Sequence, residues 1–409
     1  MLKRCCLLAA LIFIVTISGD SIAQEEGGDV TPFTINIDDA VLKDLNTRLG
    51  LARFPDQLDG VEWTYGTELG YLKELVAYWR DDYDWRAQEA ALNEFDQFKT
   101  NIDGLDLHFI HQRSKEKNAM PLIITHGWPG SVVEFTKIID MLVDPVAHGG
   151  KAEDAFHVVC PSMPGYGFSG IPTEPGFDSR KVAETFTKLM ARLGYEKYGA
   201  QGGDWGSVVT QWIARDDVEH VAGIHITMVT AGPPRGAKDP YDGVPEMEKI
   251  RHQERSSAFS EESGYSGIQG TKPQTLGYGL NDSPVGLAAW IVEKFRTWSD
   301  CDGDVESRFT KDELLTNIML YWTTQTITSS TRLYYESRHV AHLDAGGRIE
   351  VPMGCAIFPK ELTIPPRKWA ESRFNVTHWT EMPSGGHFAA LEEPELLAGD
   401  LRKFFRTVR

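Results

Sequence analysis

Apolar and polar positions divide the chain into a helical beginning and a longer part in which strands alternate with helices. Between residues 33 and 100 the apolar spacing is mostly helical. Five side chains fall on one face of a helix predicted there: Leu69, Leu72, Leu75, Val76 and Trp79. From residue 102 onward, short apolar runs predict strands separated by amphipathic segments. Such alternation is typical of a mostly parallel sheet with helices on both faces, so we expect an α/β fold.

The predicted strands place three loops at one edge of this sheet. Strands are expected at 105–110, 121–125, 156–160, 198–200 and 221–228, and helices at 132–142, 181–193 and 207–214. The loops that contain His126, Pro161 and Asp204 each follow a strand directly. In a parallel sheet the carboxyl ends of the strands share an edge, and ligands bind there. The site is therefore expected among these loops.

The alternation stops between residues 232 and 345. This segment is turn-rich over 232–243 and 264–286 and then helical, with one helix from Ser283-Pro284 to about Trp298 and another from Lys311. An all-helical insertion after a strand predicts a cap over the active edge of the sheet. The sheet resumes at 353–358 and 375–381, and a last helix runs from about 394 to 405.

These transitions predict five parts of the chain. They are a leader of residues 1–23, a helical N-terminal extension of 24–100, a first core part of 101–231, the cap of 232–345 and a second core part of 346–409. A chain of 409 residues is long enough for one large α/β domain with such additions.

The leader has the pattern of a secretory signal peptide. Lys3 and Arg4 precede an apolar run over 5–17, and Ser21 and Ala23 supply the small residues of a cleavage site. The run is short for a spanning helix, which needs about 20 residues. We therefore expect a secreted or periplasmic protein with no stable membrane span after cleavage. An uncleaved membrane anchor is the alternative.

Charge and cysteine content exclude several classes of partner. The chain has 41 Lys and Arg against 59 Asp and Glu, a formal net charge of −18, and its basic residues are not clustered. Nucleic acid and anionic lipid surfaces are therefore not expected partners. Beyond the leader, Cys160, Cys301 and Cys355 show no zinc pattern or disulfide framework, although they allow one bridge. Cys160 and Cys355 lie in apolar runs and are expected to be buried.

The stretch from Gly202 to Ser207, Gly-Gly-Asp-Trp-Gly-Ser, has the pattern of a nucleophile elbow. It follows a short apolar strand and precedes a helix, and glycines surround Asp204 where a Cβ would clash. The motif predicts an α/β-hydrolase fold, in which most members carry serine where this chain has aspartate. A simpler interpretation is a glycine-rich turn whose aspartate caps the next helix. Catalytic partners for Asp204 elsewhere in the chain would favour the nucleophile elbow over the helix cap.

Candidate partners follow Asp204 in the order that this fold requires, which is nucleophile, acid and histidine. His387 lies in a Gly-Gly-His-Phe sequence directly after the last predicted strand. Glu361 follows the end of the preceding strand, whereas Glu350 and Glu371, the weaker candidates, do not follow a strand end. We therefore expect His387 to be the base and Glu361 its partner.

An aspartate nucleophile changes the chemistry of the site. It suits displacement at an sp³ carbon and forms an alkyl ester of its own carboxylate. Water activated by His387 would then attack that ester, with the oxyanion held by the backbone amides of Trp205 and Trp128. Epoxides and alkyl halides are substrates for such displacement. An epoxide also needs an acid for its oxygen, and protonated phenols from the cap suit that role.

Six motifs together resemble the epoxide hydrolases of the microsomal type, including their fungal and insect juvenile-hormone relatives, over nearly all of the chain after the leader. They are 126–131 (HGWPGS), 202–206 (GGDWG), 271–273 (TKP), 281–290 (NDSPVGLAAW), 329–336 (SSTRLYYE) and 385–392 (GGHFAALE). The resemblance implies that Asp204 is the nucleophile, His387 the base and Glu361 the acid that orients it. It also implies that Tyr334, rather than Tyr335, and Tyr265 hold the epoxide oxygen.

The activity implied is hydrolysis of a small-molecule apolar epoxide by water to a vicinal diol, without cofactor or metal, and the aromatic-rich cap suggests bulky epoxides. Xenobiotic detoxification and the catabolism of aromatic or terpenoid epoxides are the expected roles. A haloalkane or haloacid dehalogenase shares the aspartate elbow and can use a tryptophan such as Trp205 for halide, but the cap tyrosines and the N-terminal extension oppose it. A non-catalytic binding protein, the third hypothesis, would not need nucleophile, base, acid and oxyanion loop together.

Overall fold

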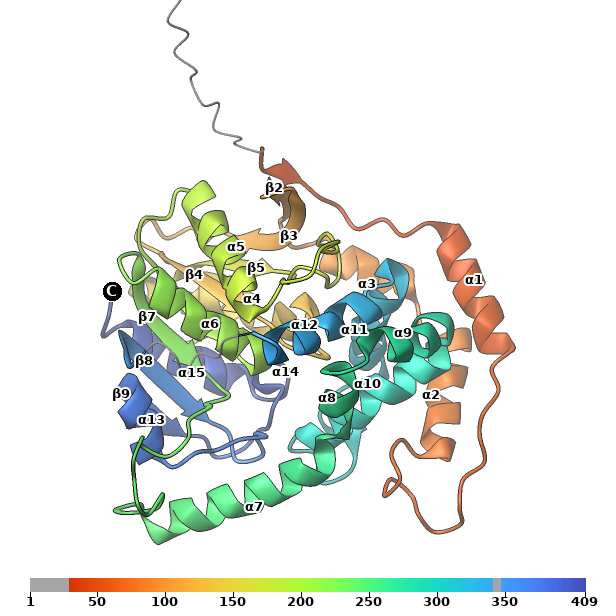
Figure 1. The fold of residues 1–409 in the computed structure, drawn as a ribbon. Coiled ribbons are helices and arrows are strands. Elements are labelled where there is room, and N and C mark those ends of the chain that lie inside the picture. The colour runs from red at the N-terminus through yellow and green to blue at the C-terminus, as the bar shows by residue number, and fades with distance from the viewer. Residues whose placement is uncertain (1–28, 341–346) are drawn as a thin grey trace, which may run out of the picture.

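The computed structural model describes residues 29–340 and 347–409 (Figure 1). The predicted leader, residues 1–23, lies outside the described residues, and so does the end of the predicted cap, residues 341–345. Within the two described ranges no helix combines the length and the apolar character that crossing a membrane requires.

In the described part of the chain, nine strands form one sheet in the order β1-β2-β3-β5-β4-β6-β7-β8-β9. The strands are β1 Thr31–Pro32, β2 Gln97–Ile102, β3 Leu105–Gln112, β4 Met120–Thr125, β5 Phe156–Pro161, β6 Tyr198–Gly202, β7 Val221–Ile226, β8 Ile349–Ile357 and β9 Phe374–Glu381. Neighbours are antiparallel from β1 to β5 and parallel from β5 to β9, which confirms the mostly parallel sheet. Thr125 and Ile226 both lie opposite Gly202, so the loops after β4, β6 and β7 meet at one edge.

Strand β2 lies where the sequence pattern predicted mainly helix. Its buried positions include Gln97 and Thr100, which are polar, so the apolar alternation that marks a strand is missing. The Gln97 side chain is satisfied inside the protein, because its amide donates to Leu92 O at 2.8 Å and its oxygen lies 2.9 Å from His108 Nε2. Because Gln97 is polar although it is buried, the pattern of apolar residues did not predict this strand.

Helices cover both faces of the sheet (Figure 1). They are α4 Thr136–Val143 and α15 Pro394–Phe405, which pack together on one face, and α5 Ser179–Arg192 and α6 Asp204–Asp216, which pack together on the other. Glycines of β6 allow the helices on both faces to pack closely against this strand. A Cβ at Gly199 would lie 2.3 Å from Phe405, and one at Gly202, on the opposite face, 2.2 Å from Gly206. Short helical segments connect these elements: η1 Val132–Phe135, η2 Pro145–His148, η3 Ala152–Asp154, α13 Arg367–Arg373 and α14 Ala389–Glu392.

The hydrophobic core fills the space between the sheet and its helices. Phe156 of β5 and Phe186 of α5 are among its largest fully buried side chains. Cys160 and Cys355 are buried there, as predicted, and all three cysteines of the described ranges, Cys301 included, are free thiols. Buried thiols of this kind behave as small apolar side chains.

The N-terminal region adds a layer of three helices, which are α1 Asp39–Gly50, α2 Leu69–Asp81 and α3 Trp85–Leu92. They pack against helices α10 and α11 of the segment that follows β7. The apolar face predicted for α2 is confirmed for four of its five residues, and Leu69 is partly exposed. This face anchors the N-terminal layer.

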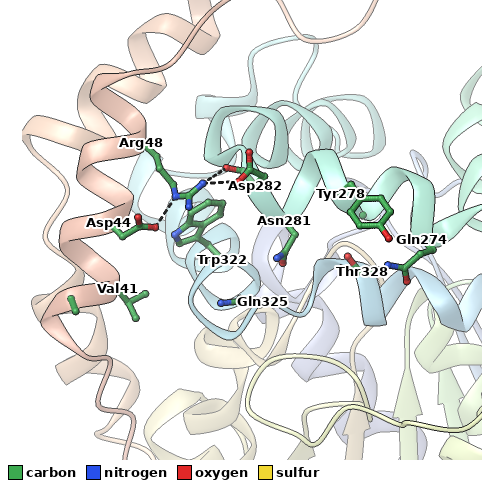
Figure 2. A pocket seen from close by; sticks show the side chains of 12 residues that line it. Val41, Asp44, Arg48, Gln274, Tyr278, Asn281, Asp282, Trp322, Gln325 and Thr328 are labelled. Atoms are coloured by element: carbon green, nitrogen blue, oxygen red, sulfur yellow. Dashed lines mark hydrogen bonds and ion pairs between the residues drawn. The ribbon is translucent and has the colours of Figure 1, made fainter.

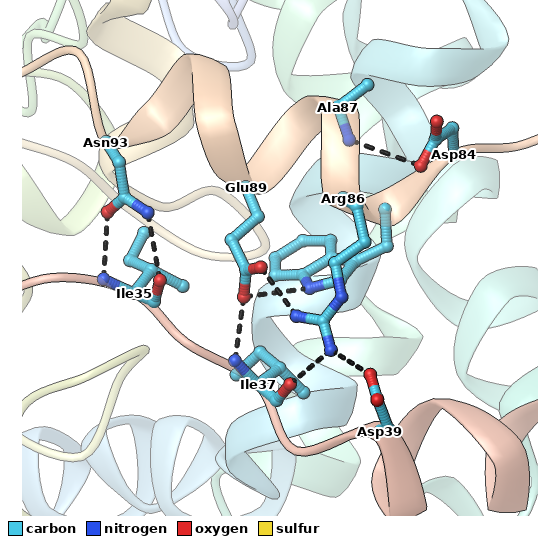
Figure 3. A network of polar contacts seen from close by, with 9 residues as sticks. Ile35, Ile37, Asp39, Asp84, Arg86, Ala87, Glu89 and Asn93 are labelled. Carbon is cyan, nitrogen blue, oxygen red and sulfur yellow. Dashed lines mark hydrogen bonds and ion pairs between the residues drawn. The ribbon is translucent and has the colours of Figure 1, made fainter.

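Polar contacts attach the extended segment before α1 to α3 (Figure 3). Glu89 Oε1 accepts from Ile37 N at 2.7 Å, and Glu89 Oε2 accepts from Arg86 at 2.6 Å. Asn93 binds both backbone groups of Ile35, accepting from its N–H at 2.8 Å and donating to its oxygen at 2.9 Å. The segment that precedes α1 is therefore fixed by hydrogen bonds to its backbone.

A helical insertion separates β7 from β8. Its helices are α7 Glu246–Glu262, α8 Gly264–Gln269, α9 Pro273–Asp282, α10 Pro284–Trp298, η4 Val305–Ser307, α11 Lys311–Thr324 and α12 Ile327–Arg338. Helix α10 begins as predicted, because the Ser283 side chain caps it by accepting from Gly286 N at 3.0 Å.

The prediction of a turn-rich stretch over 264–286 is wrong, because α8 and α9 occupy it. Its glycines serve helix packing rather than turns. A Cβ at Gly277 of α9 would lie 2.3 Å from the Thr328 hydroxyl of α12. The missing side chain thus lets two helices approach closely, which outweighs the low helix propensity of glycine.

Candidate active site

The predicted elbow forms where β6 ends and α6 begins. Asp204 is the first residue of α6 and has φ 46°, in the left-handed region that costs a non-glycine residue free energy. A Cβ at Gly206 would lie 2.0 Å from Thr125 O, so only glycine fits beneath the turn. Gly203 is the N-cap of α6. The interpretation of Asp204 as a helix cap is therefore wrong.

The carboxylate of Asp204 lies between two loops. Trp128 N donates to Oδ1 at 2.8 Å, and His387 Nε2 lies 3.5 Å from Oδ2. Glycine is needed at Gly127, because a Cβ there would lie 2.3 Å from Asp204 Cβ. The Trp205 amide belongs to the first turn of α6, whose N–H groups have no partner within the helix. Of the two predicted oxyanion-hole amides, that of Trp128 therefore contacts the Asp204 carboxylate, and that of Trp205 directly follows Asp204 in the chain.

His387, in the loop after β9, is fixed from two sides. Its backbone N–H donates to Trp298 O at 2.9 Å, and its Nδ1 donates to Glu361 Oε1 at 2.6 Å. Asp204, His387 and Glu361 are 8 %, 6 % and 1 % exposed, so water screens their charges little. Burial lowers the pKa of His387, but the charges of Glu361 and Asp204 outweigh this effect and hold it well above its ordinary value. The resting imidazole is therefore protonated.

Of the three candidate acids, the structure brings only Glu361 to His387. Glu361 Oε1 also accepts from Leu362 N at 2.6 Å, which fixes the carboxylate just beyond the end of β8. Glu350 and Glu371 are exposed, and they pair with Arg348 and Arg367.

Two tyrosines of the helical insertion pack against Trp128 of the oxyanion loop and line the same cavity as Asp204. The Tyr265 ring of α8 stacks on Trp128 with centroids 5.3 Å apart, and the Tyr334 ring of α12 lies edge-on to Trp128 at 5.9 Å and to Trp205 at 4.9 Å. Burial raises the pKa of both phenols above the ordinary value, so both stay protonated. The Tyr334 hydroxyl is buried beside the Tyr265 hydroxyl and makes no hydrogen bond of good geometry among the described residues.

Asp204 and both tyrosines line a cavity of about 620 Å³ between the sheet edge and the helical insertion. Its apolar lining includes Trp205, Val208, Trp212, Met228, Phe259 and Leu362. A concave apolar cavity with a few convergent polar groups is the usual form of a small-molecule site. The groups that carry chemistry therefore open onto space that suits an apolar ligand.

A second cavity, of about 630 Å³, lies between α1, α9, α11 and α12 (Figure 2). Its charged side chains pair with one another, because Arg48 lies 2.7 Å from Asp44 and 2.8 Å from Asp282. No residue of the elbow or of the His387 loop lines it. We therefore assign the chemistry to the cavity at Asp204.

Two polar residues beside the site were not among the sequence candidates. His126 accepts from Met163 N at 3.2 Å and donates to Gly127 O at 3.0 Å, and burial lowers its pKa to about 4, so it stays neutral and joins two loops. Glu134 of η1 folds back over Gly130, and burial of its carboxyl raises the pKa to about 8. His126 is the first residue of the HGWPGS motif and Glu134 lies three residues after the motif ends, but no spacing rule indicated the partners of either side chain.

Comparison with known proteins identifies the family. A family model described as epoxide hydrolase N terminus matches residues 30–135, and one described as alpha/beta hydrolase fold matches residues 120–251. Epoxide hydrolase 1 of Sus scrofa is 42 % identical over 411 residues, which cover 94 % of this chain and 90 % of the relative. The chain belongs to the epoxide hydrolase family.

Solved structures agree with this epoxide hydrolase in fold. Juvenile hormone epoxide hydrolase from the silkworm Bombyx mori matches with a TM-score of 0.87 and 36 % identity over 93 % of this chain and 95 % of that one. The Aspergillus niger epoxide hydrolase matches with a TM-score of 0.83 and 32 % identity over 93 % and 97 %. These matches confirm the predicted α/β-hydrolase fold and the predicted class of enzyme. In residues 29–340 and 347–409, no group of three His, Cys, Asp or Glu side chains could hold a metal ion.

Proposed function

We propose that this epoxide hydrolase converts an apolar epoxide and water to a vicinal diol through an alkyl ester on Asp204. The observation that carries the proposal is the surroundings of one buried carboxylate: Trp128 N on one oxygen, His387 at the other, and two phenols across the cavity. Each of these groups faces an atom whose charge changes during such a reaction.

In the first step, Asp204 Oδ2 attacks a ring carbon and the bond from that carbon to the epoxide oxygen breaks. The electron pair of the bond passes to the oxygen, which takes a proton from Tyr334 or Tyr265. Both phenols begin protonated and lie side by side, and the Tyr334 hydroxyl, which makes no hydrogen bond of good geometry, can donate to the epoxide oxygen when the substrate binds. Asp204 Oδ1 becomes the ester carbonyl oxygen and keeps its hydrogen bond from Trp128 N.

Ester formation also prepares the base. It removes the negative charge of Asp204, which is one of the two charges that support the raised pKa of His387. The pKa of His387 then falls, and its proton returns to the tyrosinate left by the first step. The imidazole therefore becomes a base only after the ester exists.

In the second step, water gives one proton to His387 Nε2 and attacks the carbonyl carbon of Asp204. The Trp128 and Trp205 amides stabilise the oxyanion. The intermediate then expels the diol oxygen, which takes the second proton of that water. Asp204 is again a carboxylate, now with one oxygen from water, and His387 is again protonated as in the resting enzyme.

The cavity supports a bulky apolar epoxide as substrate. Its aromatic and aliphatic lining favours the transfer of an apolar group from water, by about 25 cal/mol per Å² of surface buried. Aromatic or terpenoid epoxides have this character, and their detoxification or catabolism is the role that we propose. The dehalogenase hypothesis lacks comparable support, since a halide needs no pair of protonated phenols.

A rapid-quench experiment with enzyme in excess over a styrene-like epoxide tests the proposal. We expect the peptide that contains Asp204 to gain the mass of the epoxide during the first turnover and to lose it as diol forms. Asp204→Asn is the control and should show neither mass gain nor diol. Diol formation with no adduct on the peptide at any time would contradict the ester, and halide release from haloalkanes without diol from epoxides would support the dehalogenase.

A further inference from the structure

The loop that carries the base, residues 385–388, lies against the end of helix α10 of the helical insertion. The His387 N–H donates to Trp298 O at 2.9 Å, and the Gly385 N–H donates to Asp300 Oδ2 at 3.0 Å. The rings of His387 and Trp298 are also in contact, edge to face, with centroids 5.1 Å apart. The insertion therefore helps to place the base.

The buried side chain of Glu392 connects these two segments a second time. Its Oε1 accepts from Phe388 N, directly after His387, at 2.9 Å, and its Oε2 accepts from Asp300 N at 2.8 Å. Glu392 is 8 % exposed, so water competes little for these hydrogen bonds, and a carboxylate acceptor makes them strong. One side chain thus joins the loop of the base to the end of α10, and neither of the two proposed steps uses it.

A purely local role does not account for both contacts of Glu392. Phe388 is the N-cap residue of the short helix α14, so an acceptor for its N–H supports the start of that helix. The second oxygen, however, binds the N–H of a residue 92 positions earlier in the chain. The carboxylate therefore does more than cap α14.

We propose that Glu392 and Asp300 are positioning residues for His387 in ester hydrolysis. They hold the loop of the base against the end of α10, so that His387 Nε2 stays in place to take a proton from the attacking water. Asp204 keeps its own contact with Trp128 N, so alkylation does not depend on this connection. The inference rests on the proposed ester mechanism and concerns its second step only.

Glu392 can bind both N–H groups only as a carboxylate, because a protonated oxygen must itself donate. Burial raises the pKa of Glu392 to about 7, although its two backbone hydrogen bonds and the positive charges of His387 and Arg308 oppose this effect. The variants are therefore compared at about pH 9, where the wild-type carboxyl is ionised.

Glu392→Gln breaks the connection in whichever orientation its amide takes. The amide offers one oxygen that accepts and one NH₂ group that only donates, so either the Phe388 N–H or the Asp300 N–H loses its acceptor. The side-chain volume is nearly unchanged. A displacement of about 1 Å at a reacting group costs about 10²-fold in rate. We expect ester decay to slow by about 10²-fold while alkylation stays within about twofold of wild type.

Rapid-quench mass analysis with enzyme in excess measures both rates, because the peptide that contains Asp204 gains the mass of the epoxide on alkylation and loses it on hydrolysis. Glu89→Gln is the matched control. Glu89 is also 8 % exposed and also accepts from a backbone N–H, that of Ile37 at 2.7 Å, but it belongs to α3 of the N-terminal layer. This variant should keep both wild-type rates.

A double variant separates positioning of His387 from general damage to the site. In His387→Gln the base is already absent, so adding Glu392→Gln should leave the lifetime of the adduct within about twofold. Further slowing in the double variant would overturn the proposal, because Glu392 would then support another part of the site. Unchanged ester decay in Glu392→Gln would also overturn it, and so would alkylation that slows as much as decay.

If Glu392→Gln does not fold, Asp300→Ala repeats the test, because it removes the acceptor of the Gly385 N–H. The same slowing of ester decay alone is expected, and the same contrary results would overturn the proposal. Absence of an Asp204 adduct in rapidly quenched wild-type enzyme would instead count against the ester mechanism, and thus separates the two failures.

Discussion

Replacement of Tyr334 by phenylalanine should slow the reaction and leave the stability of the protein nearly unchanged. The ring keeps its contacts with Trp205 and Trp128, so the substitution changes no packing. It removes only the hydroxyl, which lies beside the Tyr265 hydroxyl, borders the cavity and makes no hydrogen bond of good geometry within the described residues. Its loss therefore leaves no strongly hydrogen-bonded group unpaired, and we expect the free energy of unfolding to change by less than about 1 kcal/mol.

The kinetic effect follows from the same atom. A preorganised donor aimed at a developing negative charge is worth about 2.7–4 kcal/mol, or about 10²–10³-fold in rate. We expect the rate of alkylation to fall by that factor if Tyr334 carries most of the proton donation. Stopped-flow fluorescence in single turnover measures this step, because Trp205 lies against both Tyr334 and the substrate cavity. Urea unfolding measures the stability.

Tyr321→Phe is the matched control, because the same substitution there removes a hydrogen bond of good geometry and should lower stability. The buried Tyr321 hydroxyl donates to Gly130 O at 2.6 Å, and its loss leaves that oxygen unpaired, at a cost of about 1–3 kcal/mol. An unchanged alkylation rate in Tyr334→Phe would refute the donor role. A loss of stability there would show that the hydroxyl is hydrogen-bonded in the resting enzyme.

Three further predictions concern the base and the elbow. His387→Gln should still be alkylated and should accumulate the adduct, seen by intact-protein mass; unmodified enzyme during turnover would contradict the base role. Decay of the ester in wild-type enzyme, followed by stopped flow, should accelerate as pH rises, because only the neutral His387 imidazole accepts a proton from water. Ester formation has removed the Asp204 charge that helps to raise the pKa of His387. Decay that slows with rising pH would contradict this. Gly206→Ala should abolish diol formation, since its Cβ would meet Thr125 O at 2.0 Å, whereas Gly399→Ala, with open space around it, should retain full activity.

Much of the sheet and of the site could be predicted because each relevant residue has a local signal. Asp204 lies in a glycine-rich turn between strand and helix, and His387 and Glu361 each follow a strand end. The carboxyl ends of parallel strands share one edge, so these three residues had to come near one another. The structure joins them through contacts of 3.5 Å and 2.6 Å.

What the sequence could not predict depends on contacts between distant segments. Strand β2 was missed because Gln97 is polar yet buried against His108, and α9 was missed because Gly277 serves a helix contact with Thr328. Glu134 was missed for a similar reason, since its side chain returns over the preceding loop. The pattern of residue types along the chain does not show which distant residues come into contact, because tertiary packing determines those contacts.

The central claim is that Asp204 forms the ester, and one turnover in heavy-oxygen water tests it most directly. With enzyme in excess over epoxide, the attacking water leaves its oxygen in the carboxylate of Asp204, and the diol takes its new oxygen from the enzyme. We predict that the peptide containing Asp204 gains one heavy oxygen and that the first diol released contains none. Labelled diol from an unlabelled peptide would mean that water attacks the epoxide directly, and the ester mechanism would be wrong.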